Sequence, residues 1–429
     1  MATSIRKTDD THSEAETDSG WPRGVRLAVL GGLAFAHLVL CTILTFRYSP
    51  TENEVAHLPA GLAIWRTGRF DLYKVNPPLP RLVAAIPLIM SPHQEDWSRY
   101  TANTARRPEW QVAHDFFEAN GERSFEFFRM ARWACLPFLL LGLIVCWRWG
   151  RELRGDWGGL MAASLWCFSP NILGHGSLIT PDVPAVACGL LAAWRFSHWL
   201  KSPTWKNGTL AGICLGVALL TKTYWVSLLM IWPGLWLVWR CGQLSADRSA
   251  SPRSWGGEFL QLTAILLLGL HILNTGYLYQ GTGTPLREFN FYSRSFTGKS
   301  LDPELDPPGN RFRERIWGGI PVPFPQEYLL GIDVQKWDFE QRMWSYLLGE
   351  WSQEGWWHYY LVGLFFKVPV GVWILCAWAL GSFIRNRNLR REFAPLLALV
   401  VPALGILLLA SLQRGMNHHV RYVFAMLPV

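Results

Sequence analysis

The sequence has 429 residues, of which 50% are hydrophobic and 14% aromatic, including 25 tryptophans. Charged residues make up only 17%, against about 25% in an ordinary soluble domain, so the composition indicates a membrane protein. The net charge of +8 does not indicate a nucleic-acid partner, because the basic residues lie in short loops between apolar runs and form no continuous stripe.

Apolar runs long enough to cross a bilayer divide the chain. A hydrocarbon core of about 30 Å needs about 20 helical residues, and about nine runs with few charges approach this length. The predicted spans lie near residues 25–46, 127–148, 157–173, 182–199, 207–221, 224–240, 257–279, 358–384 and 393–412. A tenth run begins at Tyr422 just before the chain stops, so we expect further spans after the last residue.

The segments outside the runs have distinct compositions. Residues 1–23 are polar and acidic and are predicted to be a disordered tail, followed by residues 24–429 as one multi-span domain. The first run is too long for a signal peptide, so we expect it to remain as an anchor. In the first large loop, about 47–126, two pieces with helical spacing, Glu54 to Arg66 and Pro80 to Met90, are too short to span and predict helices along the membrane interface. A second large loop covers about 280–356.

The distribution of Lys and Arg predicts the orientation. Most of the basic residues of the short loops lie at 148–154, 201–206, 240–253 and 385–391. All four loops fall on the same side as the N-terminus, and basic loops are retained in the cytoplasm. The N-terminus is therefore predicted to be cytoplasmic and both large loops to lie on the outer face.

Ionisable residues at the outer ends of the spans are candidates for chemistry, because charges at membrane depth are costly. Glu52, Asn53, Glu54 and His57 directly follow the first span. Three residues apart on a helix, Glu54 and His57 would share one face and could address one substrate. The alternative is a solvated helix start, capped by Thr51 or Asn53 and favoured by the two glutamates.

Three further charged residues lie near the same outer boundary. Asp182 opens the fourth span, where it could instead be an N-cap. Lys367 lies inside the eighth run, where it could snorkel, but together with Arg421 it would suit an anionic headgroup. The sequence contains no phosphate-binding glycine-rich loop, no His-Glu-x-x-His motif and no Cys-x-x-Cys pair. Soluble nucleotide chemistry and a metal framework of cysteines are therefore not indicated.

A set of motifs in a fixed order resembles a known family. The motifs are Glu54-x-x-His57 with Gly61 and Gly68, Asn76-Pro77-Pro78-Leu79, His175 through Thr180-x-Asp182, Pro325-Gln326-Glu327-Tyr328-Leu329-x-Gly331, Tyr346-Leu347-x-Gly349-Glu350 to Lys367-x-Pro369, and Arg421-Tyr422. Together they resemble bacterial lipid-carrier-dependent membrane glycosyltransferases of the C-type superfamily. That group includes protein O-mannosyltransferases and the aminoarabinose transferases of lipid A.

The resemblance implies an all-α polytopic protein of the bacterial inner or plasma membrane. It would transfer a sugar, usually with inversion, from a polyprenyl-phosphate-linked donor to a hydroxyl of a protein, lipid or glycan acceptor on the outer face. Glu54 is predicted as the base, with Asp182 and Glu52 as substitutes. The candidates for binding substrate and lipid phosphate are Lys367, Arg421, His57, Asn53, Asn76, Arg81 and His175. No metal ligands are assigned, although a divalent ion could bridge carboxylate and phosphate.

The sequence also departs from the family pattern. The usual Asp-Glu pair is Asn53-Glu54 here, and the usual Glu-His before Pro-Pro-Leu is Val75-Asn76. Two alternatives therefore stay open. One is a non-catalytic relative that binds the lipid-linked sugar. The other is a transporter or flippase of lipid-linked sugars, which is expected to place charges near the midplane and to contain broken, repeated helices.

Overall fold

The computed structural model describes residues 20–98, 100, 107–246, 255–302, 306–386, 396–413 and 415–428. Residues 1–19 of the predicted tail lie outside the described residues. The α-helices are α1 (Arg23–Arg47), α2 (Glu52–Thr67), α3 (Leu79–Ile89), α4 (Pro108–Asn120), α5 (Arg123–Ala134), α6 (Leu136–Phe168), α7 (Pro170–Gly176), α8 (Asp182–Lys201), α9 (Trp205–Leu219), α10 (Leu228–Ala246), α11 (Trp255–Gly276), α12 (Arg294–Thr297), α13 (Gln326–Glu340), α14 (Tyr359–Lys367), α15 (Val370–Arg385) and α17 (Leu397–Leu412).

Short 3-10 helices and a single hairpin complete the described secondary structure. The 3-10 helices are η1 (Thr223–Ser227), η2 (Leu286–Glu288), η3 (Ile316–Gly319) and η5 (Val420–Met426), and the strands are β1 (Ser345–Leu347) and β2 (Glu350–Ser352). The strands pair antiparallel, with Tyr346 opposite Trp351. The expected all-α class is confirmed, because every predicted span corresponds to helix in the described part of the chain.

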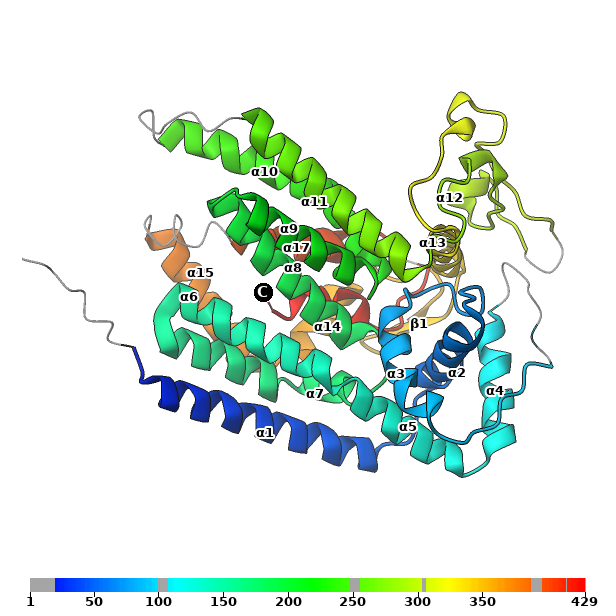
Figure 1. Cartoon of the computed structure of the whole chain (residues 1–429), viewed down its shortest axis with the longest axis horizontal. Helices are drawn as coiled ribbons and strands as arrows, with labels where there is room; N and C mark the ends of the chain where they lie inside the picture. The colour runs from blue at the N-terminus through cyan, green and yellow to red at the C-terminus, as the bar shows by residue number, and fades with distance from the viewer. Residues whose placement is uncertain are drawn as a thin grey trace, which may run out of the picture.

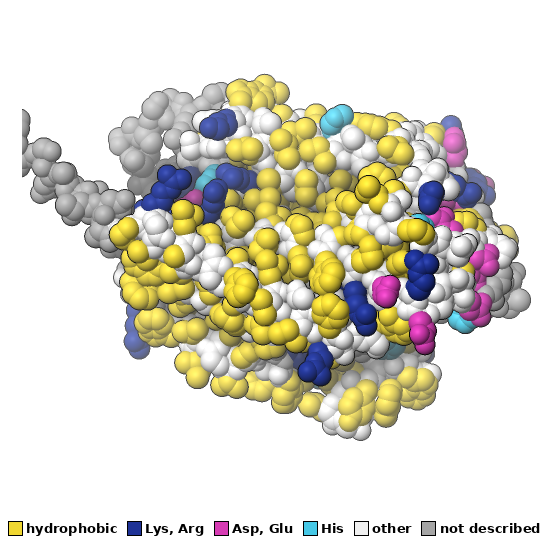
Figure 2. Space-filling model, turned by 60° about the horizontal axis from the view of Figure 1, so that its bottom comes forward, with side chains coloured by type: hydrophobic (Ala, Val, Ile, Leu, Met, Phe, Trp, Pro, Cys, Tyr) yellow, Lys and Arg dark blue, Asp and Glu magenta, His cyan; other side chains and the backbone are white. Residues whose placement is uncertain are grey.

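Several helices are suited to cross a membrane. By length and hydropathy the described residues contain 3 such stretches, Arg23–Arg47, Arg123–Phe168 and Trp255–Gly276, or up to 4 if α14 and α15 are one span bent by 109°. Figure 2 shows why the surface suits lipid: hydrophobic side chains cover the middle of this face, whereas most of the charged ones gather towards its two ends. The molecule is a polytopic integral membrane protein.

The stretch Arg123–Phe168 contains two predicted spans. Arg154 and Gly155 leave helical geometry, and Gly155 has a φ of 63°, which glycine adopts without steric cost. The chain turns back there, so that the indole of Trp166 donates a hydrogen bond of 3.0 Å to the carbonyl of Leu139. The two halves of α6 therefore pack against each other as the spans predicted near 127–148 and 157–173.

The largest core lies among α8, α9, α10 and α11. The rings of Phe196 on α8 and Trp232 on α10 stack with their centroids 4.1 Å apart, and both side chains are fully buried. Large aromatic side chains bury much apolar area, and a stacked pair contributes about 0.5–1.5 kcal/mol beyond that burial. This core holds the helices rigidly beside one another (Figure 1).

Helices α2, α3, α4, α12 and α13 gather at one end of the bundle, which we call the loop end (Figure 1). The two helices predicted for the first large loop are present as α2 and α3. They do not simply lie on a surface, because α2 is buried from Ala56 to Ile64. Gly61 permits this packing, since a Cβ there would lie 2.3 Å from the carbonyl oxygen of Arg81.

Chain direction brings several charged segments to the loop end. Helix α8 begins there at Asp182 and runs away from it, and α9 returns to the turn that holds Lys222. The final segment, with Arg421 in η5, packs against the start of α8. Alternating antiparallel helices thus place four distant parts of the chain around one site, the fourth being the start of α2.

Candidate functional site

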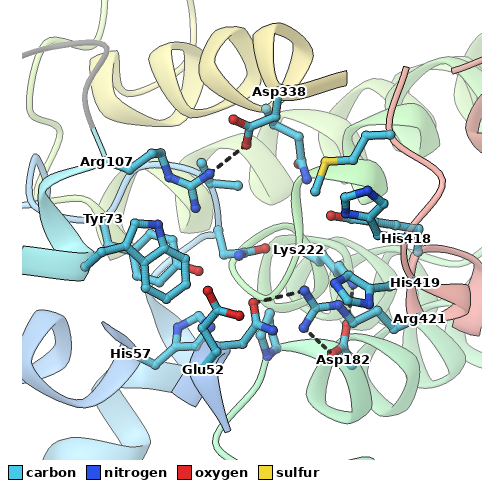
Figure 3. Close-up of a pocket in the computed structure, with 18 residues that line it drawn as sticks. Glu52, His57, Tyr73, Arg107, Asp182, Lys222, Asp338, His418, His419 and Arg421 are labelled. Carbon is cyan, nitrogen blue, oxygen red and sulfur yellow. Dashed lines mark hydrogen bonds and ion pairs between the residues drawn. The ribbon is translucent and has the colours of Figure 1, made fainter. Parts of the chain in front are cut away.

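A cavity of about 210 Å³ lies at the loop end, between α2, α4, α8, α13 and the segment 416–422 (Figure 3). Its charged and imidazole side chains are Glu52, His57, Arg107, Asp182, Lys222, Asp338, His418, His419 and Arg421. Six of the predicted site residues line it: Glu52, Asn53, His57, Asn76, Asp182 and Arg421. The other four predicted residues, Glu54, Arg81, His175 and Lys367, do not.

Glu54, the predicted base, is fully buried outside the cavity. Its carboxylate accepts two hydrogen bonds from the guanidinium of Arg132, at 2.8 and 2.7 Å. It also accepts hydrogen bonds from the backbone N–H and hydroxyl of Thr51 and from the backbone N–H of Ile179, at 2.9, 3.1 and 3.0 Å. With these five donors, the carboxylate joins α2 to α5 and to the loop before α8. This placement matches the capped helix start and argues against a role as base.

Glu52 occupies the position that the sequence argument gave to Glu54. Figure 3 shows its side chain pointing into the cavity, towards Arg421 and away from the helix that carries it. No described residue donates a hydrogen bond to its carboxylate, and the residue is exposed. A carboxylate without a protein partner in a polar cavity is free to accept a proton from a bound molecule.

Asp182 lies on the other side of the cavity and holds two cations. The ammonium of Lys222 donates to its Oδ1 at 2.5 Å, and Nη1 of Arg421 lies 4.0 Å from its Oδ2. Nη2 of Arg421 also donates to the side-chain oxygen of Asn53 at 2.9 Å. Burial lowers the pKa of Lys222, and the nearby Asp182 carboxylate acts in the opposite direction. The result is a compact cationic wall fixed from two helices.

Lys222 was missed by the sequence argument. It stands in a short turn between two apolar runs, and its only signal was that this turn falls on the same side as Asp182. Lys367, predicted as the second cation, is exposed at the end of α14 and does not line the cavity. The two cations beside Asp182 are thus Lys222 and Arg421.

His175 and Arg81 support the walls from behind. Nδ1 of His175 lies 3.8 Å from Oδ2 of Asp182, and its ring meets Phe424 edge-on. Arg81 is buried and donates hydrogen bonds to the carbonyls of Tyr73 and Asn76. Both residues therefore shape the cavity without facing it.

An aromatic wall lies opposite the cations. The rings of His57 and Tyr73 lie 4.7 Å apart, and the ring of Trp110 lies 6.5 Å from that of Tyr73. Burial, reinforced by the charge of Arg81, lowers the pKa of His57 well below its usual value, so this imidazole is neutral. Arg107 is held next to this wall by Glu109 and by Asp338 of α13, the latter at 2.6 Å. Sequence patterns did not single out Arg107 or Asp338.

The segment before η5 adds two imidazoles. His418 contacts the carbonyl oxygen of Trp344 at 2.8 Å through Nε2. Burial lowers the pKa of His419 to about 4, with a further contribution from the positive charge of Arg421. Among the described residues, the one cluster with a geometry suited to a metal is His114, Asp115 and Glu118 on α4, and none of its members lines the cavity.

The fold is that of an all-α polytopic membrane protein. A family model described as dolichyl-phosphate-mannose-protein mannosyltransferase matches residues 126–251. The resemblance predicted from the sequence is therefore confirmed. A search of curated proteins finds no match.

The structure is similar to crystal structures of ArnT from Cupriavidus metallidurans. For the form bound to undecaprenyl phosphate, the TM-score is 0.50 and the identity 16%, over 95% of this chain and 59% of that chain. For the apo form, the TM-score is 0.45 and the identity 16%, over 93% of this chain and 58% of that chain. The chain thus spans less than two thirds of the length of ArnT. At this identity the likeness concerns the fold.

Proposed function

We propose that the protein transfers a sugar from a polyprenyl-phosphate-linked donor to an acceptor hydroxyl on the outer face of the membrane. The observation that carries the proposal is the arrangement in one cavity of Glu52, whose carboxylate has no partner among the described residues, and two cations that it faces, Lys222 and Arg421. ArnT, whose fold is similar, was crystallised with undecaprenyl phosphate, which supports a lipid-phosphate donor. The basic loop at 201–206 follows the end of α8 opposite to Asp182, and basic loops are retained in the cytoplasm, which supports the outer face for the cavity.

The proposed reaction is a single displacement. Glu52 takes the proton of the acceptor hydroxyl, whose oxygen forms a bond to the anomeric carbon as the bond to the phosphate oxygen breaks. The electron pair of that bond leaves with the polyprenyl phosphate, and the anomeric configuration inverts. Lys222 and Arg421 stabilise the charge that grows on the departing phosphate, which is where preorganised cations lower the barrier most.

Asp182 and the aromatic wall position these groups. Asp182 neutralises part of the charge of Lys222 and holds its ammonium beside the guanidinium of Arg421. A phosphate dianion would bind both cations at little further desolvation cost, because folding has already removed water from them. The ring of Trp110, which is only partly buried and lines the cavity, offers a flat apolar surface for the C–H face of a sugar ring. In this scheme Glu54 maintains the site rather than reacting.

The test compares Glu52→Gln with the wild-type protein in purified form. We expect the variant to bind a radiolabelled polyprenyl-phosphate sugar but to transfer it at least about 10²-fold more slowly, as for the loss of a general base. Repeating the assay with EDTA tests whether a divalent ion takes part. Wild-type transfer rates in Glu52→Gln would refute the assignment.

The same assay separates the competing functions. Movement of a fluorescent lipid-linked sugar between leaflets, without transfer to any acceptor, would identify a flippase. Donor binding with neither movement nor transfer would identify a non-catalytic relative. The described ionisable groups of the cavity lie at the loop end of the bundle and not midway along it, which favours transfer over transport.

A further inference from the structure

The β1–β2 hairpin carries an exposed aromatic face. Trp344, Tyr346, Leu348 and Trp351 are 59%, 52%, 69% and 65% exposed. Trp344 and Tyr346 are two residues apart and so lie on one face of the hairpin, and the ring of Trp351 lies 5.2 Å from that of Tyr346 on the paired strand. Leu348 stands at the tip, in a turn where Gly349 has a φ of 97°. A group of large apolar side chains exposed together usually marks an interaction site.

The opposite face of the hairpin is held against the cavity wall. Ser345 is buried, and its hydroxyl accepts a hydrogen bond of 3.1 Å from the backbone N–H of Asn417. The backbone N–H of Met343 donates to the carbonyl of Gly415, also at 3.1 Å. Asn417 lies between Met416 and His418, which both line the cavity. The hairpin is thus fixed in orientation, with its aromatic face turned away from the site.

The hairpin is followed closely along the chain by exposed apolar helices. Strand β2 ends at Ser352, and α14 begins at Tyr359 after only six residues. The intervening Trp357 is exposed, as are Phe365 and Phe366 on α14. Helix α15, which follows, has no buried residue and is apolar up to its last turn. Only short linkers and the short helix α14 therefore separate the hairpin from a helix that is exposed and apolar up to its last turn.

We propose that the aromatic face of the hairpin inserts into the lipid headgroup region at the loop end of the bundle. Trp and Tyr prefer this region because their rings are apolar while their N–H and O–H groups remain hydrated. The aliphatic tip, Leu348, favours lipid over a carbohydrate, since sugars stack on flat rings. Insertion would also brace the cavity wall at Asn417, so the bilayer would help to set the shape of the site.

Depth-dependent quenching tests the insertion. The protein is prepared with Leu348→Cys in a background of Cys241→Ser and Cys376→Ser, which removes the two exposed cysteines. A bimane label is attached, and the full chain is placed in phosphatidylcholine nanodiscs with and without a lipid that carries a shallow nitroxide. The matched control is Lys299→Cys, in the exposed turn after α12, which Figure 1 shows away from the bundle.

We expect the nitroxide lipid to quench the label at position 348 at least about twice as strongly as the label at position 299, as for a side chain at headgroup depth. Aqueous iodide is expected to quench the label at position 299 more strongly than the label at position 348. Equal quenching by lipid at the two positions, or iodide quenching at 348 as strong as at 299, would place the hairpin in water and overturn the proposal. The readout involves no sugar transfer, so it stands or fails independently of the proposed function. Only the bracing of the cavity wall rests on that function.

Discussion

The buried pair of Glu54 and Arg132 offers a direct test of which glutamate reacts. Both side chains are almost fully buried, and Arg132 also donates to the carbonyls of Thr45, Tyr48 and Ser49. In Glu54→Gln the guanidinium keeps its charge and loses its counter-ion, while the new amide NH₂ faces existing donors. Removing one partner of a buried pair costs about 3–5 kcal/mol, so we expect the free energy of unfolding to fall by about that amount.

Glu52→Gln is the matched control, two residues away on the same helix. Its carboxylate has no described protein partner, so its removal is expected to change the free energy of unfolding by less than about 0.5 kcal/mol. Unfolding is followed in micelles by tryptophan fluorescence during titration with a denaturing detergent. Sugar transfer is measured on the same preparations.

The two variants should therefore separate stability from activity. Glu54→Gln is expected to be destabilised, and the double variant Glu54→Gln with Arg132→Met to recover part of the loss, because the unpaired charge is gone. Glu52→Gln is expected to be stable and inactive. A Glu54→Gln protein with wild-type stability and no transfer would refute this reasoning and restore Glu54 as the base.

Two further predictions concern the cavity, one its cationic wall and the other His419. Lys222→Met should weaken the binding of polyprenyl phosphate by about tenfold or more, which is the contribution of a charge-assisted hydrogen bond. Lys367→Met is the control and should change that affinity little. Equal losses of affinity in a titration with the lipid phosphate would contradict the assignment of Lys222 to the cationic wall. His419 has a pKa of about 4 in the folded protein against 6.5 for an unperturbed histidine, so between these values the unfolded chain binds more protons. The free energy of unfolding should therefore decrease as the pH falls from 6.5 to 4, and His419→Gln should make this decrease smaller. The same dependence of the free energy of unfolding on pH in His419→Gln and in the wild type would contradict the prediction.

The predictions from the sequence agree with the structure where each depends on a single segment of the chain. Span positions follow from the length of apolar runs, which each segment carries by itself. The count of basic residues predicted one common side for Asp182, Arg421 and the start of α2, and these three line one cavity. The two helices of the first large loop were also predicted to within a few residues, although their burial was not.

Which of two nearby glutamates faces the cavity could not be predicted from the segment that contains them. Glu52 and Glu54 lie two residues apart, which separates them by about 200° around a helix. Which one faces the cavity depends on Arg132, 78 positions further along the chain, because its guanidinium needs a buried counter-ion. Periodicity alone does not reveal that partner.

The sequence by itself determined that this is a multi-span membrane protein, which loops share a side, and the family that its motifs resemble. Only the tertiary structure decided which charges meet: Glu52 instead of Glu54, and Lys222 instead of Lys367, around Asp182 and Arg421. The physical reason is that hydropathy acts on each segment independently. An ion pair, by contrast, depends on distances of a few ångströms that the packing of antiparallel helices sets.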